Sequence, residues 1–151
     1  MNKPALPFQI GLIDKSDEAA QSFIYSTWLK SFRDKNISKE HPKLIHPHVY
    51  MINQHKVVER LLRDESVDVY AAINPDDESH IFGYLVASPT TLHYIYVRLK
   101  LQNFGIGRSL FNHWNNNLND SYLYTHLTLS WERFNKGKGT YNPYLLYKGV
   151  L

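Results

Sequence analysis

The sequence predicts a mixed α/β (α+β) fold, in which helices flank a mostly antiparallel sheet that contains one parallel strand pair. Three alternating apolar segments, 67–73, 81–87 and 92–98, are joined by short turns and are typical of an antiparallel meander. A helical pattern at 107–118 then separates 92–98 from another alternating segment, 125–131. A strand–helix–strand connection of this kind normally returns parallel and right-handed.

The composition predicts one globular domain that covers residues 1–151. Hydrophobic residues make up 43% and charged residues 21% of the chain, and there is no cysteine. Disulfides, thiol catalysis and thiolate metal sites are therefore excluded. The sequence has no apolar run of about 18 residues and no evident signal peptide, so we expect a cytoplasmic protein without a membrane segment. A net charge of +3 is too weak to indicate nucleic-acid binding by itself.

The first half begins with an expected strand at 8–13 and continues with two expected helices. Ser16 and Asp17 can cap the first helix, whose apolar face recurs at helical spacing. That face consists of Ala20, Phe23, Ile24, Thr27, Trp28 and Phe32. The second helix is expected over 48–63, with Val58, Leu61 and Leu62 facing inward.

The second half contains the meander, a helix and a further strand. The Asn-Pro-Asp turn after residue 73 marks a hairpin whose loop we expect to be longer than two residues. In the helix expected at 107–118, the inward side chains are Leu110, Phe111, Trp114 and Leu118. After the strand at 125–131 come a basic loop and an aromatic segment that could form a last strand.

The segment Gln102–Ser109, "QNFGIGRS", forms the junction between a strand and a helix. The first turn of a helix has unpaired N–H groups and a partial positive charge, so it can hold a phosphate. Gly105 and Gly107 would let the backbone approach an anion, and Arg108 could add a charged contact. Taken alone, two glycines at such a junction are more often explained by turn chemistry than by a ligand. The motif is neither a Walker A loop nor a complete dinucleotide fingerprint.

This junction resembles the signature of the GNAT superfamily of acyl-CoA-dependent N-acetyltransferases. The resemblance lies in Tyr96-Val97 at the end of a strand, followed by Gln102-x-x-Gly105-x-Gly107 at the start of a helix, and the order of elements over about 8–131 also fits. It implies a GNAT-like fold that binds acetyl-CoA at a splayed parallel strand pair, near Trp131. The cofactor-binding residues that it implies are Tyr96, Val97, Arg98, Gln102, Asn103, Phe104, Gly105, Ile106, Gly107 and Arg108.

Two departures from the family pattern bear on this resemblance. The positions where the family usually has a proline, a second basic residue or a glycine are occupied by Leu99, Asn103 and Phe104. These changes weaken phosphate contacts made by side chains and leave contacts made by the backbone. The C-terminal end is also shortened, which suggests that a second subunit completes the sheet or the cleft in a homodimer.

The resemblance also suggests which residues transfer protons. His93 lies nine residues before Gln102 on the strand that should line the cleft, and an imidazole can accept a proton near neutral pH. The alternative is a histidine that points away from the cleft. For the general acid we select Tyr144, and then Tyr141, although the sequence favours a structural role for each tyrosine taken singly.

The function that these observations predict is transfer of acetyl from acetyl-CoA to a primary amine, by direct attack in a ternary complex. The acceptor is a small molecule or a protein. The main alternative is a catalytically inactive GNAT-like module that binds CoA or another protein. A nucleic-acid binder that uses Arg133, Lys136 and Lys138 is a third class, which the modest charge disfavours.

The sequence predicts no metal site. His41, His46 and His48 cluster, but prolines interrupt the cluster and no carboxylate has metal-ligand spacing. We interpret these histidines as part of a loop that could border the acceptor pocket.

Overall fold

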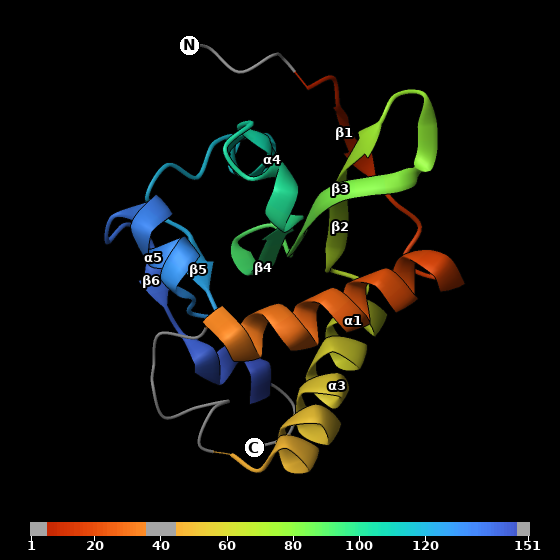
Figure 1. Ribbon diagram of the computed structural model, residues 1–151. Helices are drawn as coiled ribbons and strands as arrows, with labels where there is room; N and C mark the ends of the chain where they lie inside the picture. The colour runs from red at the N-terminus through yellow and green to blue at the C-terminus, as the bar shows by residue number, and fades with distance from the viewer. Residues whose placement is uncertain (1–5, 36–44, 148–151) are drawn as a thin grey trace.

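The computed structural model describes residues 6–35 and 45–147, which form a single six-stranded sheet with helices on both faces (Figure 1). The strands are β1 (Gln9–Leu12), β2 (Asp68–Asn74), β3 (Asp77–Ala87), β4 (Thr91–Val97), β5 (Leu123–Tyr124) and β6 (Thr140–Tyr141). The helices are α1 (Glu18–Lys35), α3 (Pro47–Arg63), α4 (Ile106–Trp114) and α5 (Leu129–Asn135), with short 3-10 helices η1 (Leu99–Leu101) and η2 (Pro143–Tyr147). In the described part of the chain, no helix has the length and apolarity required to cross a membrane.

Two hydrophobic cores lie on opposite faces of the sheet. Helices α1 and α3 cover one face, where Trp28 stacks on Tyr94 of β4 with ring centroids 4.6 Å apart. Helix α4 covers the other face through Leu110 and Trp114, as the sequence predicts. From Tyr94 to Val97 the side chains of β4 alternate between the two cores.

The starts of the first two helices follow from local side-chain caps. An Asp17 carboxylate oxygen accepts a hydrogen bond from the N–H of Ala20 at 2.9 Å, which confirms the predicted cap of α1. His46 performs the same task for α3, where its Nδ1 accepts from the N–H of His48 at 3.2 Å, and Pro47 occupies the first turn.

Strands β1 to β4 form the predicted antiparallel sheet, but the β2–β3 loop is shorter than expected. Asn74 and Asp77 are paired, so only Pro75 and Asp76 lie between the strands. The Asn74 side chain accepts a hydrogen bond from the N–H of Asp76 at 2.9 Å, which stabilises the tight turn. Because the turn is tight, β3 begins at Asp77, four residues earlier than predicted. Register shifts after Ala72 accommodate the unequal numbers of residues in the paired parts of β2 and β3.

The prediction of a strand at 125–131 is wrong. The parallel partner of β4 is β5, two residues long, and the chain then leaves the sheet for α5. The hydroxyl of Thr128 accepts a hydrogen bond from the N–H of Trp131 at 3.1 Å, so this threonine caps a helix within the expected strand. β6 pairs with β5 in parallel, so the sheet has two parallel pairs where one was expected. α4 also ends at Trp114, before the predicted limit.

Candidate functional site

The central feature of the candidate site is a bulge in β4. Ala87 of β3 pairs with Leu92, whereas the preceding residue, Val86, pairs with Tyr94. His93 is therefore an extra residue in β4 with no counterpart in β3. Such bulges locally redirect a side chain and increase the twist of a strand.

The bulge places two consecutive side chains on the same face of the sheet. Tyr94 stacks on Trp28 of α1. His93 lines a cavity together with Val57 and Leu61 of α3, which covers that same face. In a regular strand one of the two side chains would lie on the α4 face. His93 consequently points into the space between β4 and α3.

Strand β4 separates from its parallel neighbour immediately after this point. The two strands pair only at Thr91 with Leu123 and at Leu92 with Tyr124. The last backbone link is the hydrogen bond from the N–H of Thr125 to the carbonyl of Leu92, at 3.1 Å. The splay predicted for this pair thus begins at Thr125 and not near Trp131.

Beyond the splay, no strand of the described part of the chain lies beside one edge of β4. The N–H of Arg98 donates to the carbonyl of Phe82 in β3 at 3.0 Å, so the alternate groups of Ile95 and Val97 face the other way. The side-chain amide of Gln102 approaches the carbonyl of Val97 at 3.3 Å. This edge runs from the bulge toward the glycine segment.

The glycine segment forms the start of α4. Gly105 is the N-cap with φ = 81°, a conformation that favours glycine, and it provides no side-chain cap. The first intrahelical bond runs from the N–H of Ser109 to the carbonyl of Gly105, so the N–H groups before Ser109 have no acceptor within the helix. Gly107 lies against Val97, where a Cβ would be 3.6 Å from a methyl group. The buried Ile106 anchors the turn to the core.

The side chains of the other expected cofactor residues point in several directions. Tyr96 and Arg98 lie on the α1 face: Tyr96 forms an edge contact with Phe23, and the guanidinium of Arg98 lies 4.6 Å from the same ring. Arg108 extends toward α5, where its guanidinium lies 5.4 Å from the ring of Phe134. The backbone N–H of Arg98 is paired with β3, and Tyr96 lies opposite Tyr84 of the same strand, so the backbone groups of these two residues face β3.

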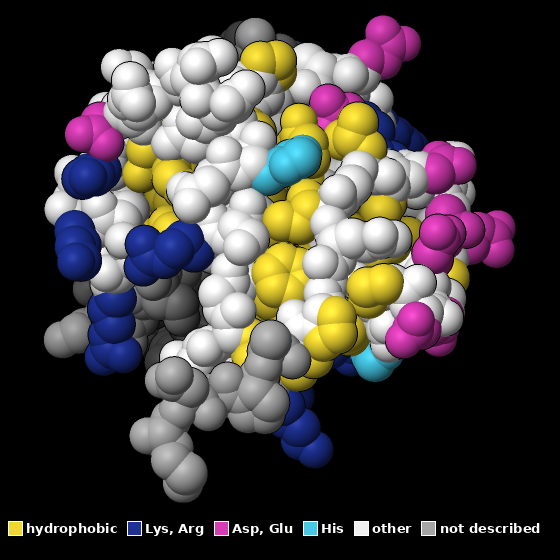
Figure 2. All heavy atoms as spheres, turned by 90° about the horizontal axis from the view of Figure 1, so that it is seen from above, with side chains coloured by type: hydrophobic (Ala, Val, Ile, Leu, Met, Phe, Trp, Pro, Cys, Tyr) yellow, Lys and Arg dark blue, Asp and Glu magenta, His cyan; other side chains and the backbone are white. Residues whose placement is uncertain are grey.

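Charge is unevenly distributed on the face that Figure 2 shows. Acidic side chains gather on the side where the β2–β3 hairpin lies, and basic side chains gather on the side where α5 lies. The basic residues of α5 and its end include Arg133 and Lys136. An anionic ligand would therefore be attracted to the α5 side.

A chain of buried polar groups connects His93 to α3. Nδ1 of His93 lies 3.1 Å from the hydroxyl of Thr125, which lies 3.0 Å from Nδ1 of His126. Nε2 of His126 in turn lies 3.0 Å from the side-chain nitrogen of Gln54. The sequence analysis missed Gln54, Thr125 and His126, because they lie in three different segments and form no motif.

His93 and His126, the two histidines of this hydrogen-bonded series, are neutral near pH 7. His93 is 7% exposed, and burial lowers its pKa to about 4 against an opposing effect of the Asp64 charge. Burial, with a further effect of the nearby His93, lowers the pKa of His126 to about 3, while a backbone hydrogen bond to His93 opposes it.

The proton positions along the chain are coupled. When the Gln54 nitrogen donates to His126, Nδ1 of His126 donates to Thr125 and the hydroxyl donates to His93, which leaves the proton of His93 on Nε2. When the Gln54 oxygen faces His126 instead, every bond reverses and Nε2 of His93 becomes an acceptor. Gln54 therefore determines whether the outer nitrogen of His93 donates or accepts.

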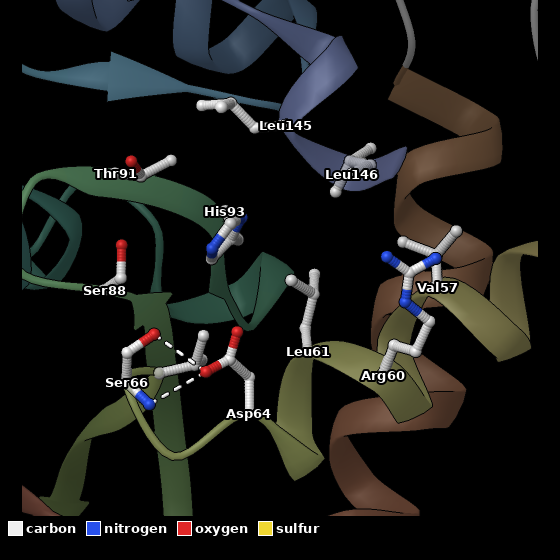
Figure 3. A pocket seen from close by; sticks show the side chains of 11 residues that line it. Val57, Arg60, Leu61, Asp64, Ser66, Ser88, Thr91, His93, Leu145 and Leu146 are labelled. Atoms are coloured by element: carbon white, nitrogen blue, oxygen red, sulfur yellow. Dashed lines mark hydrogen bonds between the residues drawn. The ribbon is translucent and has the colours of Figure 1, made fainter. Parts of the chain in front are cut away.

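His93 borders a cavity of about 170 Å³ on the α3 side of the sheet (Figure 3). The walls come from α3, the α3–β2 connection, the β3–β4 turn, β4 and η2. The polar lining consists of Arg60, Asp64, Ser66, Ser88, Thr91 and His93. Beyond the bulge, His126, Thr128 and Trp131 fill most of the space between β4 and β5, which leaves about 10 Å³.

The two expected tyrosines lie near this region but line neither cavity. Tyr141 in β6 stacks on Tyr124 with centroids 5.5 Å apart, and burial raises its pKa. Tyr144 in η2 is 74% exposed. The residues of η2 that do line the larger cavity are Leu145 and Leu146.

The described residues contain no group of three or more histidine, cysteine or carboxylate side chains placed to hold a metal ion. The imidazole of His46 is occupied in the cap of α3, where it accepts a hydrogen bond from the backbone N–H of His48. His41 lies outside the described residues.

Comparison with solved structures identifies the architecture. A protein from Staphylococcus aureus subsp. aureus, described as a GNAT family acetyltransferase, aligns with 73% of this chain and 92% of its own at 11% identity and a TM-score of 0.50. This chain has a GNAT-like fold. A protein from Pyrococcus furiosus described as an acetyl transferase covers 94% of this chain and 91% of its own, at 16% identity and a TM-score of 0.49. A ribosomal-protein-alanine N-acetyltransferase from Brucella melitensis covers 76% and 74%, at 14% identity and a TM-score of 0.49.

Sequence comparison does not reach the same result. No protein-family model matches the chain, and no curated protein matches it. The GNAT-like fold nevertheless has the features expected from the sequence: a parallel β4–β5 pair that splays and a glycine turn that begins α4.

Proposed function

We propose that this protein is an N-acetyltransferase that moves acetyl from acetyl-CoA to a primary amine by direct attack in a ternary complex. The observation that carries the proposal is the bulge at His93, where a buried imidazole lies at the point where β4 leaves β5. The free edge of β4 connects this imidazole with the uncapped start of α4. A thioester held along this edge would have its reacting end beside His93.

The residues at the site fit acetyl-CoA, which would supply an activated acetyl thioester. The first N–H groups of α4, with Gly105 as N-cap, would hold phosphates through the backbone. The edge groups of Ile95 and the N–H of Val97 would pair with the amides of the pantetheine arm, whereas the Val97 carbonyl would first have to release the Gln102 side chain. The buried Nε1 of Trp131 has no hydrogen-bond partner among the described residues, and Trp131 lines the space between β4 and β5. Because α5 side chains fill that space, a bound arm requires α5 to shift.

The reaction needs removal of protons from the amine. The N–C bond forms as the C–S bond breaks, and the ammonium group loses two protons, of which one ends on the CoA sulfur and one in solvent. His93 is neutral at pH 7 and can accept a proton when Nε2 is free. This role requires the Gln54 oxygen to face His126. The charge that develops on the carbonyl oxygen would be stabilised by a backbone N–H of β4.

We propose that the proton donor to the CoA sulfur is one of two tyrosines, Tyr141 or Tyr144. Tyr141 is held by its stack on Tyr124, whereas the side chain of Tyr144 is mostly in solvent. Replacing Tyr141 with phenylalanine preserves the stack and removes only the hydroxyl. We therefore expect Tyr141→Phe to test the acid role more cleanly than Tyr144→Phe.

Two measurements test the proposal in sequence. Thermal unfolding with acetyl-CoA, CoA and ATP comes first, and we expect stabilisation by both CoA species and not by ATP. Thiol release over a panel of amines comes second, with His93→Gln as the variant. Failure of both CoA species to stabilise the protein would sink the proposal. CoA binding without thiol release for any amine would favour the alternative, a CoA-binding module without catalysis.

A further inference from the structure

We propose that the cavity beside His93 is the acceptor site, and that Asp64 binds the ammonium group of a small primary alkylamine there. The proposal rests on the proposed function, because it assigns the second substrate of the same site. It is carried by the position of an oriented, solvent-exposed carboxylate on the wall of a cavity that has both polar and apolar walls and also contains His93.

The carboxylate of Asp64 is fixed from one side only. One oxygen, Oδ1, accepts hydrogen bonds from the N–H of Ser66 at 2.9 Å and from its hydroxyl at 2.8 Å. Figure 3 shows the other oxygen pointing toward the cavity, on the side of His93. Within residues 6–35 and 45–147, no hydrogen bond or ion pair is formed by this second oxygen. The hydrogen bonds from Ser66 lower the pKa of Asp64, so the group is ionised at neutral pH.

Other charges near the cavity leave this carboxylate to a ligand. Asp64 is the C-cap of α3, and the carbonyl end of a helix favours a cation. Lys15 donates to the backbone carbonyls of Asp64 and Val67 and does not form an ion pair with the carboxylate. The guanidinium of Arg60 points away from Asp64 (Figure 3). His93 is neutral, so Asp64 contributes the negative charge of the wall.

The size and lining of the cavity limit the acceptor. A volume of about 170 Å³ is close to that of engineered cavities that hold benzene, so it admits about six to eight heavy atoms. The apolar walls come from Val57, Leu61, Leu145 and Leu146. These features fit a short alkyl or benzyl amine, with the body against the leucines and the nitrogen between Asp64 and His93.

A matched pair of variants tests this assignment. Asp64→Asn removes the charge and keeps an oxygen for Ser66. Asp77→Asn is the control, because Asp77 makes the same two hydrogen bonds with Ser79, at 3.1 Å and 2.6 Å, and lies outside the cavity. With n-butylamine and benzylamine as probes, we expect Asp64→Asn to raise KM at least tenfold. Asp77→Asn should leave KM unchanged, and stabilisation by acetyl-CoA should be the same in both variants.

Direct binding separates this inference from the proposed function. Titration of ¹⁵N-labelled protein with n-butylammonium chloride should shift the amides of Ser66 and Thr91, and the apparent Kd should rise tenfold in Asp64→Asn. Sodium chloride at equal concentration controls for ionic strength. Absence of these shifts, or equal binding by Asp64→Asn and Asp77→Asn, would overturn the acceptor site even if thiol release occurs. Specific binding without any thiol release would support the site and count against the proposed catalysis.

Discussion

The hydroxyl of Thr125 lies 3.1 Å from Nδ1 of His93 and forms the first link of a buried chain that continues to His126. Thr125 belongs to the segment in which the chain leaves β5, so this bond ties the end of the β4–β5 pairing to the bulge in β4. The orientation of His93 therefore depends on residues of β5 and α3 as well as on β4.

Acidification should destabilise the protein through the two buried histidines. Their pKa values are lowered from 6.5 to about 4 for His93 and about 3 for His126, so between pH 6.5 and pH 4 the unfolded chain binds protons that the folded chain does not. Stability is then complete above pH 6.5 and falls as the pH decreases. Each histidine should cost about 2 kcal/mol between pH 6.5 and pH 5. Urea unfolding at the two pH values measures the loss.

The matching variants identify the groups responsible. His93→Gln and His126→Gln should each reduce this pH dependence, whereas replacing the exposed His113 with glutamine should leave it intact. A slope that is the same in all three variants would contradict the assignment to the buried pair.

Substitution of Gln54 should reveal how His93 acts. Gln54→Glu places an acceptor against His126, which favours Nδ1–H on His93 and a free Nε2. If His93 is the base, thiol release by Gln54→Glu is retained or increased relative to the wild type. Gln54→Leu should lose activity, because leucine cannot fix the direction of the hydrogen bonds between His126, Thr125 and His93. Steady-state kinetics between pH 6 and pH 9 provide the measurement. Loss of activity in Gln54→Glu with intact CoA binding would instead identify Nε2 of His93 as a proton donor.

The two glycines of the α4 turn should respond differently to alanine. Gly105 has φ = 81°, so Gly105→Ala is strained by about 1 kcal/mol and should also weaken stabilisation by CoA. A Cβ on Gly107 would make ordinary contacts with Val97 at 3.6 Å and Ile95 at 4.0 Å, and Gly107→Ala should have nearly wild-type stability. Thermal unfolding with and without CoA compares the pair. Equal losses of stability and of CoA stabilisation in the two variants would contradict a specific role for the backbone conformation at Gly105.

Gly83 should be the most sensitive glycine of the sheet. A Cβ at this position would lie 2.6 Å from the carbonyl oxygen of Tyr96 and 3.2 Å from Cα of Val97, both backbone atoms of β4. We expect Gly83→Ala to cost about 2 kcal/mol by forcing β3 and β4 apart. Gly11→Ala, with nothing within 4 Å, is the control and should change stability by less than about 0.5 kcal/mol. Denaturant unfolding of both variants measures the difference. Equal unfolding midpoints for Gly83→Ala and Gly11→Ala would contradict the prediction.

The sequence by itself determined the order of the main elements and the position of the glycine turn. The apolar periods of α1, α3 and the meander, and the cap at Asp17, depend on near neighbours, so they can be inferred from short windows. It also placed His93 on a strand that leads to Gly105. These predictions succeed because backbone preferences and amphipathic faces are local properties.

The tertiary structure decided the features that make the site. The segment at 125–131 alternates like a strand, but Trp131 packs in the core against Tyr124 and the cap at Thr128 stabilises α5 there instead. The bulge at His93 arises from its pairing with β3 and is not visible in β4 alone. Gln54, Asp64 and His126 reach His93 from other elements, because buried hydrogen bonds and cavities form between segments that only long-range packing brings together.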